Sequence, residues 1–141
     1  MLEKFDSLIG RLIQARQRGL LVNGQENEGI ESLDTAYQIQ EKVLEGLGSE
    51  SMFWKVGSTS IEAQKKLGTD EPGSCRVPEK YCFFDGDKIP IFDAHDVWVE
   101  GEFGIRLGCD LPSRAQPYGR GEIISSIDGV AASLELVGSR F

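Results

Sequence analysis

The sequence predicts an α+β chain, because two helical segments come first and most of the expected strands come later. Over residues 2–20 and 32–47, apolar side chains recur every three or four positions, which is the spacing of a helix with one buried face. Residues 98–107 instead alternate between apolar and polar side chains, as a half-buried strand does. We therefore expect a helical region over residues 1–50 and a mainly β region over residues 51–141.

The two N-terminal helices have recognisable ends. The first should end near Gly19, before a polar segment with two glycines that is expected to be a loop. Ser32 is a favourable N-cap for the second helix, and Asp34 in its first turn complements the helix dipole. Gly48 should end that helix. Neither helix carries residues that suggest chemistry, so we expect the pair to pack on another part of the chain.

The rest of the chain is predicted to consist of short elements joined by loops. In chain order these are a strand over residues 52–57, a helix with a capping box from Thr59 to Glu62 that ends at Gly68, a hairpin of strands 80–84 and 88–92 around Asp85-Gly86-Asp87, the strand 98–107, a helix over residues 122–130 and a strand over residues 132–137. Residues 69–78 and 111–120 contain prolines and glycines and are expected to be irregular.

Composition excludes some classes of function and favours others. The 141 residues include 15 Lys and Arg against 23 Asp and Glu, a net charge of −8, which argues against nucleic acid as a partner. No apolar run approaches the roughly 20 residues of a membrane span, and the charged first residues do not resemble a secretory signal. We therefore expect a cytoplasmic protein. The 3 cysteines lack CxxC spacing, which favours free thiols, and the single histidine, His95, is expected in a solvated turn.

Three glutamates are candidate metal ligands. Glu100 and Glu102 lie on the same face of the strand 98–107, with Cα atoms about 6.5–7 Å apart, so their carboxylates can converge on one cation or repel each other. The alternative is a half-buried strand with a wet, acidic outer face. Glu135 lies in an otherwise mostly apolar segment, where burial is costly unless the carboxyl group is paired, protonated or bound to a metal. The alternative there is an edge strand that turns Glu135 to water.

A lysine and three hydroxyl groups form a second candidate site. Lys55 stands between Trp54 and Val56, where a lysine commonly extends its charged end to solvent. If it is desolvated instead, it becomes a usable acid or base near neutral pH. The next residues, Ser58-Thr59-Ser60, precede the N-terminus of the expected third helix and could help to hold a carboxylate there.

Five segments, in this order over nearly the whole chain, carry a resemblance to a known family. They are Lys55-Val56-Gly57-Ser58-Thr59-Ser60, Leu67-Gly68-Thr69-Asp70-Glu71-Pro72, the pair Glu100 and Glu102, Leu107-Gly108-Cys109-Asp110-Leu111, and Leu134-Glu135-Leu136-Val137-Gly138-Ser139-Arg140. Together they resemble the 2-oxopent-4-enoate hydratase and 4-oxalocrotonate decarboxylase branch of the fumarylacetoacetate hydrolase superfamily. The resemblance implies a small helical region followed by a rolled-sheet domain, here incomplete: the N-terminal half of a member or a truncated member.

The resemblance also implies a function in the catabolism of aromatic compounds. Glu100, Glu102 and Glu135 match the ligands of a divalent cation, Mg²⁺ or Mn²⁺, and Lys55 matches an acid/base lysine. The implied lyase acts on a small 2-keto acid or its dienol, by hydration of 2-hydroxypenta-2,4-dienoate or decarboxylation of 4-oxalocrotonate. The implied partners are this small substrate, and other subunits in a homo-oligomer or in a complex with a related full-length subunit.

The chain departs from the family pattern in three respects. Gly73-Ser74 follow Pro72 where an acidic residue is common, so Asp70 or Glu71 would have to replace it, and Ala132 stands where proline is frequent. The chain is also shorter than members of the family. These departures leave two alternatives: a non-catalytic homologue that completes the sheet of a full-length partner, and a plain divalent-cation binder. The C–C hydrolases of the superfamily are a further possibility, although His95 is not placed as a hydrolytic base.

Overall fold

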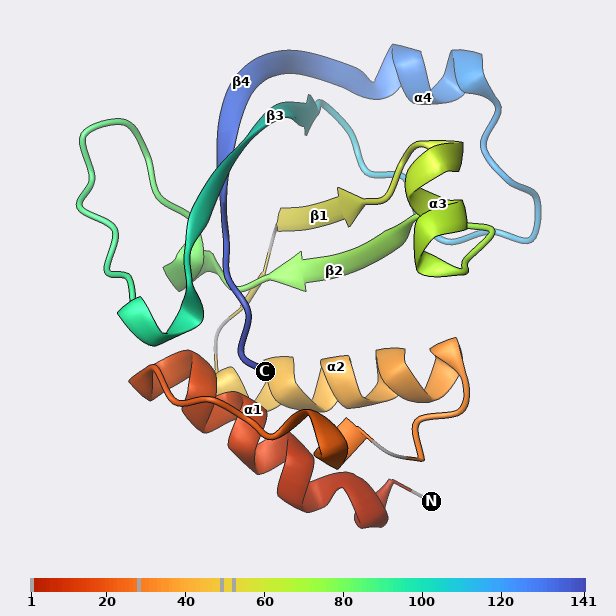
Figure 1. The fold of residues 1–141 in the computed structure, drawn as a ribbon. Coiled ribbons are helices and arrows are strands. Elements are labelled where there is room, and N and C mark those ends of the chain that lie inside the picture. Colours follow the sequence, from red (N-terminus) through yellow and green to blue (C-terminus); the bar gives the residue numbers. More distant parts are fainter. Residues whose placement is uncertain (1, 28, 49, 52) are drawn as a thin grey trace. The chain divides into compact units, whose positions relative to one another are not determined.

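The computed structural model describes residues 2–27, 29–48, 50–51 and 53–141 (Figure 1). The chain divides into two compact units, unit 1 with Met1–His95 and Arg140–Phe141, and unit 2 with Asp96–Ser139. The predicted boundary after residue 50 divides the chain differently and stays a prediction. The helices and strands are α1 (Asp6–Arg18), α2 (Leu33–Leu47), β1 (Phe53–Gly57), α3 (Ile61–Leu67), β2 (Gly73–Val77), β3 (Trp98–Leu107), α4 (Arg120–Ser126) and β4 (Ile127–Val137). The predicted α+β class is confirmed.

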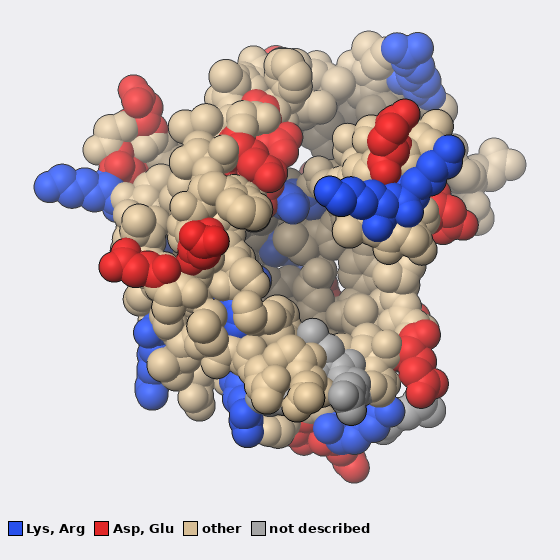
Figure 2. Space-filling view, viewed as in Figure 1, with Lys and Arg blue, Asp and Glu red and all other residues tan. Residues whose placement is uncertain are grey.

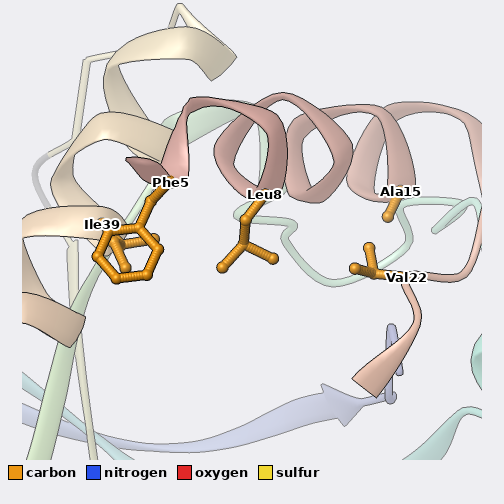
Figure 3. Close-up of a cluster of buried hydrophobic side chains, with 5 residues drawn as sticks. All are labelled: Phe5, Leu8, Ala15, Val22 and Ile39. Carbon is orange, nitrogen blue, oxygen red and sulfur yellow. The ribbon is translucent and has the colours of Figure 1, made fainter. Parts of the chain in front are cut away.

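The two long helices of unit 1 end at the residues that the sequence indicates, and α2 also begins there. The first helix was predicted from residue 2, but α1 begins at Asp6, after a 3₁₀ turn at Glu3–Phe5. Gly19 adopts φ 69° and donates its N–H to the Ala15 carbonyl at 3.0 Å, which ends α1. The Ser32 hydroxyl accepts the Thr35 N–H at 3.1 Å and caps α2, and Gly48 ends that helix with φ 65°. Their apolar faces, with Phe5 just before α1 and Val22 in the segment after it, form the buried cluster of unit 1, drawn in Figure 3: Phe5, Leu8, Ala15, Val22 and Ile39.

The first sheet pairs β1 with β2 in antiparallel register, with Lys55 opposite Cys75. Side chains of α2 cover the outer edge of β2. The Ser74 N–H donates to the Tyr37 hydroxyl, the Gln40 side chain donates to the Ser74 carbonyl, both at 3.2 Å, and Arg76 forms an ion pair with Glu41. The expectation that the helices pack on another part of the chain is therefore confirmed.

The prediction that residues 69–78 are irregular was wrong, because β2 lies within them. Its two prolines, Pro72 and Pro78, lie just outside the strand, where a missing N–H does not break the ladder. The predicted capping box was displaced by one residue, since Ser60 and not Thr59 accepts the N–H of Ala63 at 3.1 Å. Residue 52, the predicted start of β1, lies outside the described residues.

The predicted hairpin over residues 80–92 forms its turn but not its strands. The Asp87 N–H donates to the Phe84 carbonyl at 3.0 Å, and the Asp87 carboxylate accepts the Phe84 N–H at 2.8 Å. The flanking residues are a 3₁₀ turn at Glu79–Tyr81 and irregular chain that contains Pro90, so no ladder forms. The solvated turn predicted for His95 was also wrong: this side chain is 6% exposed and contacts the Leu20 carbonyl at 3.1 Å.

Unit 2 is built on a single antiparallel pair of long strands, β3 and β4. The predicted strand 98–107 is confirmed at both ends. The predicted helix over residues 122–130 was too long, because α4 ends at Ser126 and β4 begins at Ile127, where the chain starts to pair with β3. A register shift after Arg106 leaves Asp128 as an extra residue, and its carboxylate accepts from Arg106 at 3.0 Å.

Charged side chains of both signs lie on the surface (Figure 2). Figure 2 shows acidic side chains scattered over the drawn face among basic and uncharged ones, in keeping with the net charge of −8. Among the residues that the structure describes, no helix has both the length and the apolar character needed to cross a bilayer.

Candidate metal centre

The register of β3 and β4 brings the three glutamates together. Glu100 lies directly opposite Glu135, and Glu102 follows two positions along β3, opposite Ser133. Directly opposed residues of an antiparallel pair share a face, as do residues two apart on one strand. Each of the three carboxylates offers an oxygen within 4.8 Å of the other two. Two segments far apart in the sequence thus present three carboxylates on one sheet face.

The donor set suits a hard divalent cation. Oxygen atoms bound on opposite sides of one ion lie about 4 Å apart for Mg²⁺ and about 5 Å apart for Ca²⁺. The observed separation of up to 4.8 Å is compatible with Ca²⁺ as it stands, and with Mg²⁺ after a small rotation of side chains. Glu100 and Glu102 are exposed and Glu135 is half-buried, so water can complete the coordination of an ion.

Without a cation, the same arrangement concentrates negative charge. Two unit charges at such distances repel each other by roughly 1 kcal/mol in bulk water, and more where water is excluded. On the side of Glu102 the neighbours are small, since Ser133 lies opposite Glu102, whereas Trp98 and Val137 flank the pair of Glu100 and Glu135 on the same face. The small side leaves room for ligands. The metal-ligand role of these three residues stays a prediction.

Lys55 belongs to unit 1, whereas the three carboxylates belong to unit 2. It lies in the middle of β1 and its side chain is exposed. Its amine bends back along the strand: the Lys55 Nζ lies 3.2 Å from the point that a Cβ atom would occupy at Gly57. A glycine at that position therefore gives the lysine its room. The acid/base role of Lys55 stays a prediction.

Of the three predicted substrate-binding hydroxyl residues, one lines a pocket. Ser58 adopts φ 55°, an uncommon left-handed conformation for a serine, and its carbonyl accepts the Gln64 side chain at 3.0 Å. Ser60 is used as the N-cap of α3, and Thr59 is exposed. The pocket has a volume of about 80 Å³, well below that of typical ligand sites, and is lined by Leu33, Tyr37, Ser58, Leu67, Thr69, Glu71, Pro72 and Gly73.

One residue that lines the pocket is a candidate replacement for the acidic residue that is missing after Pro72. Gly73-Ser74 follow Pro72, and of the two proposed replacements Glu71 lines the pocket. Thr69, which belongs to the second of the five segments, also lines it, and so does Tyr37, to which no sequence signal pointed. Tyr37 lies on α2, which shows helical periodicity alone, and its hydroxyl is engaged by the Ser74 N–H. The contact between β2 and α2 brings Thr69 and Glu71 near Tyr37, in the first turns of α2.

Arg140, the last residue of the fifth motif, belongs to unit 1. Its carbonyl accepts the Val22 N–H at 2.7 Å. Burial, followed by the positive charge of Arg16, lowers the pKa of the Arg140 guanidinium below its ordinary value. Arg16 in turn lies over the ring of Tyr81, 4.2 Å from its centroid. The motif therefore continues from the carboxylate face of unit 2 into a basic, aromatic environment of unit 1.

The fold matches about half of a decarboxylase of known structure. A structure of 4-oxalocrotonate decarboxylase from Pseudomonas putida G7, complexed with calcium and acetate, matches with a TM-score of 0.84 at 20% identity. A second structure of that enzyme, complexed with magnesium and adipate, matches with a TM-score of 0.79 at 18% identity. The matches cover 100% of this chain and 55% and 54% of those chains.

Sequence comparison leads to hydratases of the same branch. The chain is 37% identical over 112 residues to a 2-keto-4-pentenoate hydratase of Paraburkholderia xenovorans (strain LB400), which covers 77% of this chain and 41% of that protein. It is 28% identical over 133 residues to the TodF product hydratase of Pseudomonas putida F1, which covers 92% of this chain and 49% of that protein. No family model matches the chain. The resemblance to the hydratase and decarboxylase branch is confirmed, and the chain spans between two-fifths and half of the length of these relatives.

Proposed function

We propose that this chain carries the metal-binding part of a lyase that acts on a small 2-keto acid or its dienol. The observation that carries the proposal is the cross-strand cluster of Glu100, Glu102 and Glu135, with carboxylate oxygens within 4.8 Å of one another. The names of the relatives support the reaction class, namely hydration of 2-hydroxypenta-2,4-dienoate or decarboxylation of 4-oxalocrotonate. The calcium and magnesium complexes of the structural neighbour support a divalent cation. The identity of this cation as Mg²⁺ or Mn²⁺ is our proposal.

The chemistry of the donor set agrees with this reaction class. Three carboxylates around a dication leave a local charge of −1, and Mg²⁺ keeps several coordination positions for water or substrate oxygens. The bound cation would supply Lewis-acid chemistry, which hydration and decarboxylation share because both develop negative charge on an oxygen beside a carboxylate. The three glutamates would hold the cation, and none of them is proposed to transfer a proton.

The proton transfer is assigned to Lys55. The Lys55 Nζ lies close to Gly57 on β1. A position within a strand restricts the movement of the lysine backbone more than a loop would. Ser58, Thr59 and Ser60, which follow the strand, are proposed to orient the substrate carboxylate, with Ser58 the best placed because it lines the pocket. We also propose that the protein is cytoplasmic.

Metal binding tests the proposal most directly. Mn²⁺ affinity of the purified chain is measured by calorimetry for the wild type, Glu102→Gln and the control Asp110→Asn. Both variants remove one negative charge from unit 2, but exposed Asp110 lies outside the cluster. We expect Glu102→Gln to weaken Mn²⁺ binding at least about tenfold, a loss of 1.4 kcal/mol or more, and Asp110→Asn to change it less than about twofold.

The turnover assay follows the absorbance of dienol and oxalocrotonate substrates with Mg²⁺, Mn²⁺ or EDTA. We expect turnover with either metal, none with EDTA, and loss of turnover in Lys55→Ala with Mn²⁺ affinity unchanged. Equal Mn²⁺ affinities of the wild type and Glu102→Gln would overturn the metal centre. If the chain binds the metal without any turnover, and Lys55→Ala does not change this binding, the protein is a plain divalent-cation binder.

A second candidate function is that of a non-catalytic homologue that associates with a full-length partner. The chain spans 41% to 55% of the relatives' length. Light scattering after size-exclusion chromatography separates the two candidates. An active homo-oligomer supports the lyase, and a chain that acquires a defined stoichiometry only with a full-length hydratase supports the second candidate.

A further inference from the structure

The face of the β3–β4 sheet opposite the carboxylates is uncovered and apolar. We call it the apolar sheet face; it carries Val99, Phe103, Ile105 and Leu107 from β3 and Val130, Ala132, Leu134 and Leu136 from β4. Phe103 is 83% exposed and Leu134 is 76% exposed, and Val99, Ile105, Leu107 and Val130 are exposed as well. No charged side chain interrupts this face over the paired stretch from Val99 to Ile105.

Such a face is unusual for a surface that meets only water. Monomeric proteins rarely expose apolar patches of more than a few hundred Å², and natural sheets protect exposed strands with charges or prolines. Two strands are also too few for an independently stable sheet unless one face is packed. Among the residues of unit 2 that the structure describes, Ser126 alone is buried. The apolar sheet face therefore has the composition of a core but not the burial of one.

The shape of the face also favours an incoming side chain. Gly101 lies opposite Leu134, between Val99 and Phe103 on the same strand. A Cβ atom at Gly101 would meet nothing within 4 Å. The glycine thus leaves the backbone accessible between large apolar side chains, as it does where another chain approaches a strand closely.

The comparisons indicate what covers this face. The structural match accounts for 100% of this chain but only 55% of the decarboxylase chain, so such a chain has a further part with no counterpart here. We propose that the apolar sheet face is the docking surface for that further part of a hydratase or decarboxylase chain. A second copy of this chain is the alternative occupant, and the experiment below distinguishes it from the proposed one. The proposal is independent of the metal centre, which lies on the other face of the sheet.

Co-expression tests the proposal. This chain, whole and tagged, is co-expressed with the part of the Paraburkholderia xenovorans hydratase outside the matched segment, and the product is analysed by light scattering and hydrogen exchange. We expect a 1:1 complex in which the amides of β3 and β4 exchange at least about tenfold more slowly than in the chain alone. Phe103→Asp and Leu134→Asp should each reduce recovery of the complex at least about tenfold.

Phe84→Asp is the matched control, because Phe84 is a 75% exposed phenylalanine of unit 1, and it should leave recovery unchanged. Circular dichroism of the variants alone excludes misfolding as the cause, since both replaced side chains of the face are exposed. Failure to form the complex, or a complex that survives both face variants, would overturn the proposal. A homodimer that Phe103→Asp dissociates would overturn it in favour of a second copy. Mn²⁺ affinity measured in parallel distinguishes these outcomes from failure of the metal centre.

Discussion

The two units of the chain differ in how their apolar side chains are used. In unit 1 the apolar faces of α1 and α2 are buried against each other, and α2 side chains bond to the edge of β2. In unit 2 the long strands pair fully, yet their apolar side chains remain exposed. The candidate metal ligands lie in unit 2. The unit with the candidate metal ligands is thus the one that has no buried apolar cluster among its described residues.

Backbone pairing and core packing therefore make separate contributions to the structure of this chain. Pairing of β3 with β4 is enough to set the register and so to gather the three carboxylates. It does not supply the apolar burial that dominates the free energy of folding. We therefore expect unit 1 to determine the stability of the chain, and the geometry of the metal centre to depend on whatever binds to unit 2.

Truncation of apolar side chains in the two units should have very different effects on stability. Leu8 is 3% exposed, so Leu8→Ala should lower the free energy of unfolding by about 2–5 kcal/mol through lost burial and a cavity. Leu134→Ala removes the same atoms from an exposed site and should cost less than about 0.5 kcal/mol. Urea unfolding followed by circular dichroism measures both. Equal losses would mean that the apolar sheet face is already covered in the isolated chain.

The sequence was most informative where local signals agree with the final fold. The limits of β3 follow from strict alternation, and the ends of α1 and α2 follow from Gly19, Ser32 and Gly48. The proximity of Glu135 to Glu100 could not be read from local pattern. It depends on a pairing register over a long connection, and only the family resemblance pointed to it.

The failures have one physical cause, which is that tertiary contacts override local propensity. β2 looked irregular because of its flanking prolines, yet β1 and α2 provide partners for its backbone. His95 looked solvated from its polar neighbours, but its ring packs edge-on against Phe92 and contacts the Leu20 carbonyl. The remaining lining of the pocket at Ser58 could not be read from local pattern either, because Leu33 and Tyr37 come from α2, a segment distant in the sequence.

Two glycines of unit 2 provide a finer test of how tightly its strand ends are packed. A Cβ atom at Gly108 would lie 2.9 Å from the Asp128 Cβ, next to the β-bulge, so Gly108→Ala must displace backbone. We expect a loss of about 1–3 kcal/mol in the free energy of opening the β3–β4 pair, measured by hydrogen exchange of its amides. The control Gly101→Ala meets open space and should be neutral or stabilising by a few tenths of a kcal/mol. If the two variants have equal effects, the packing around the β-bulge does not contribute to the stability of the β3–β4 pair.

The smallest effect concerns pH and the connection between β3 and β4. The Arg114 side chain, at 2.7 Å, and the Gly119 N–H, at 2.8 Å, both donate to the Glu122 carboxylate, and these bonds lower its pKa. A lowered pKa in the folded chain means that the contribution to stability is fully present above the unfolded value, about 4.3, and disappears as the pH falls through the folded value. Because Glu122 is fully exposed, the effect should be confined to α4 and its preceding loop.

An NMR titration that follows the Glu122 side chain and the Gly119 amide measures this pKa directly. We expect both signals to titrate together below the ordinary glutamate value, and Arg114→Gln to move that midpoint upward, since it removes the larger of the two causes. The amides of β3 and β4 should not follow this titration, because their ladder does not involve Glu122. If they do follow it, the connection controls the register of the strands, and unit 2 is more cooperative than its uncovered apolar face implies.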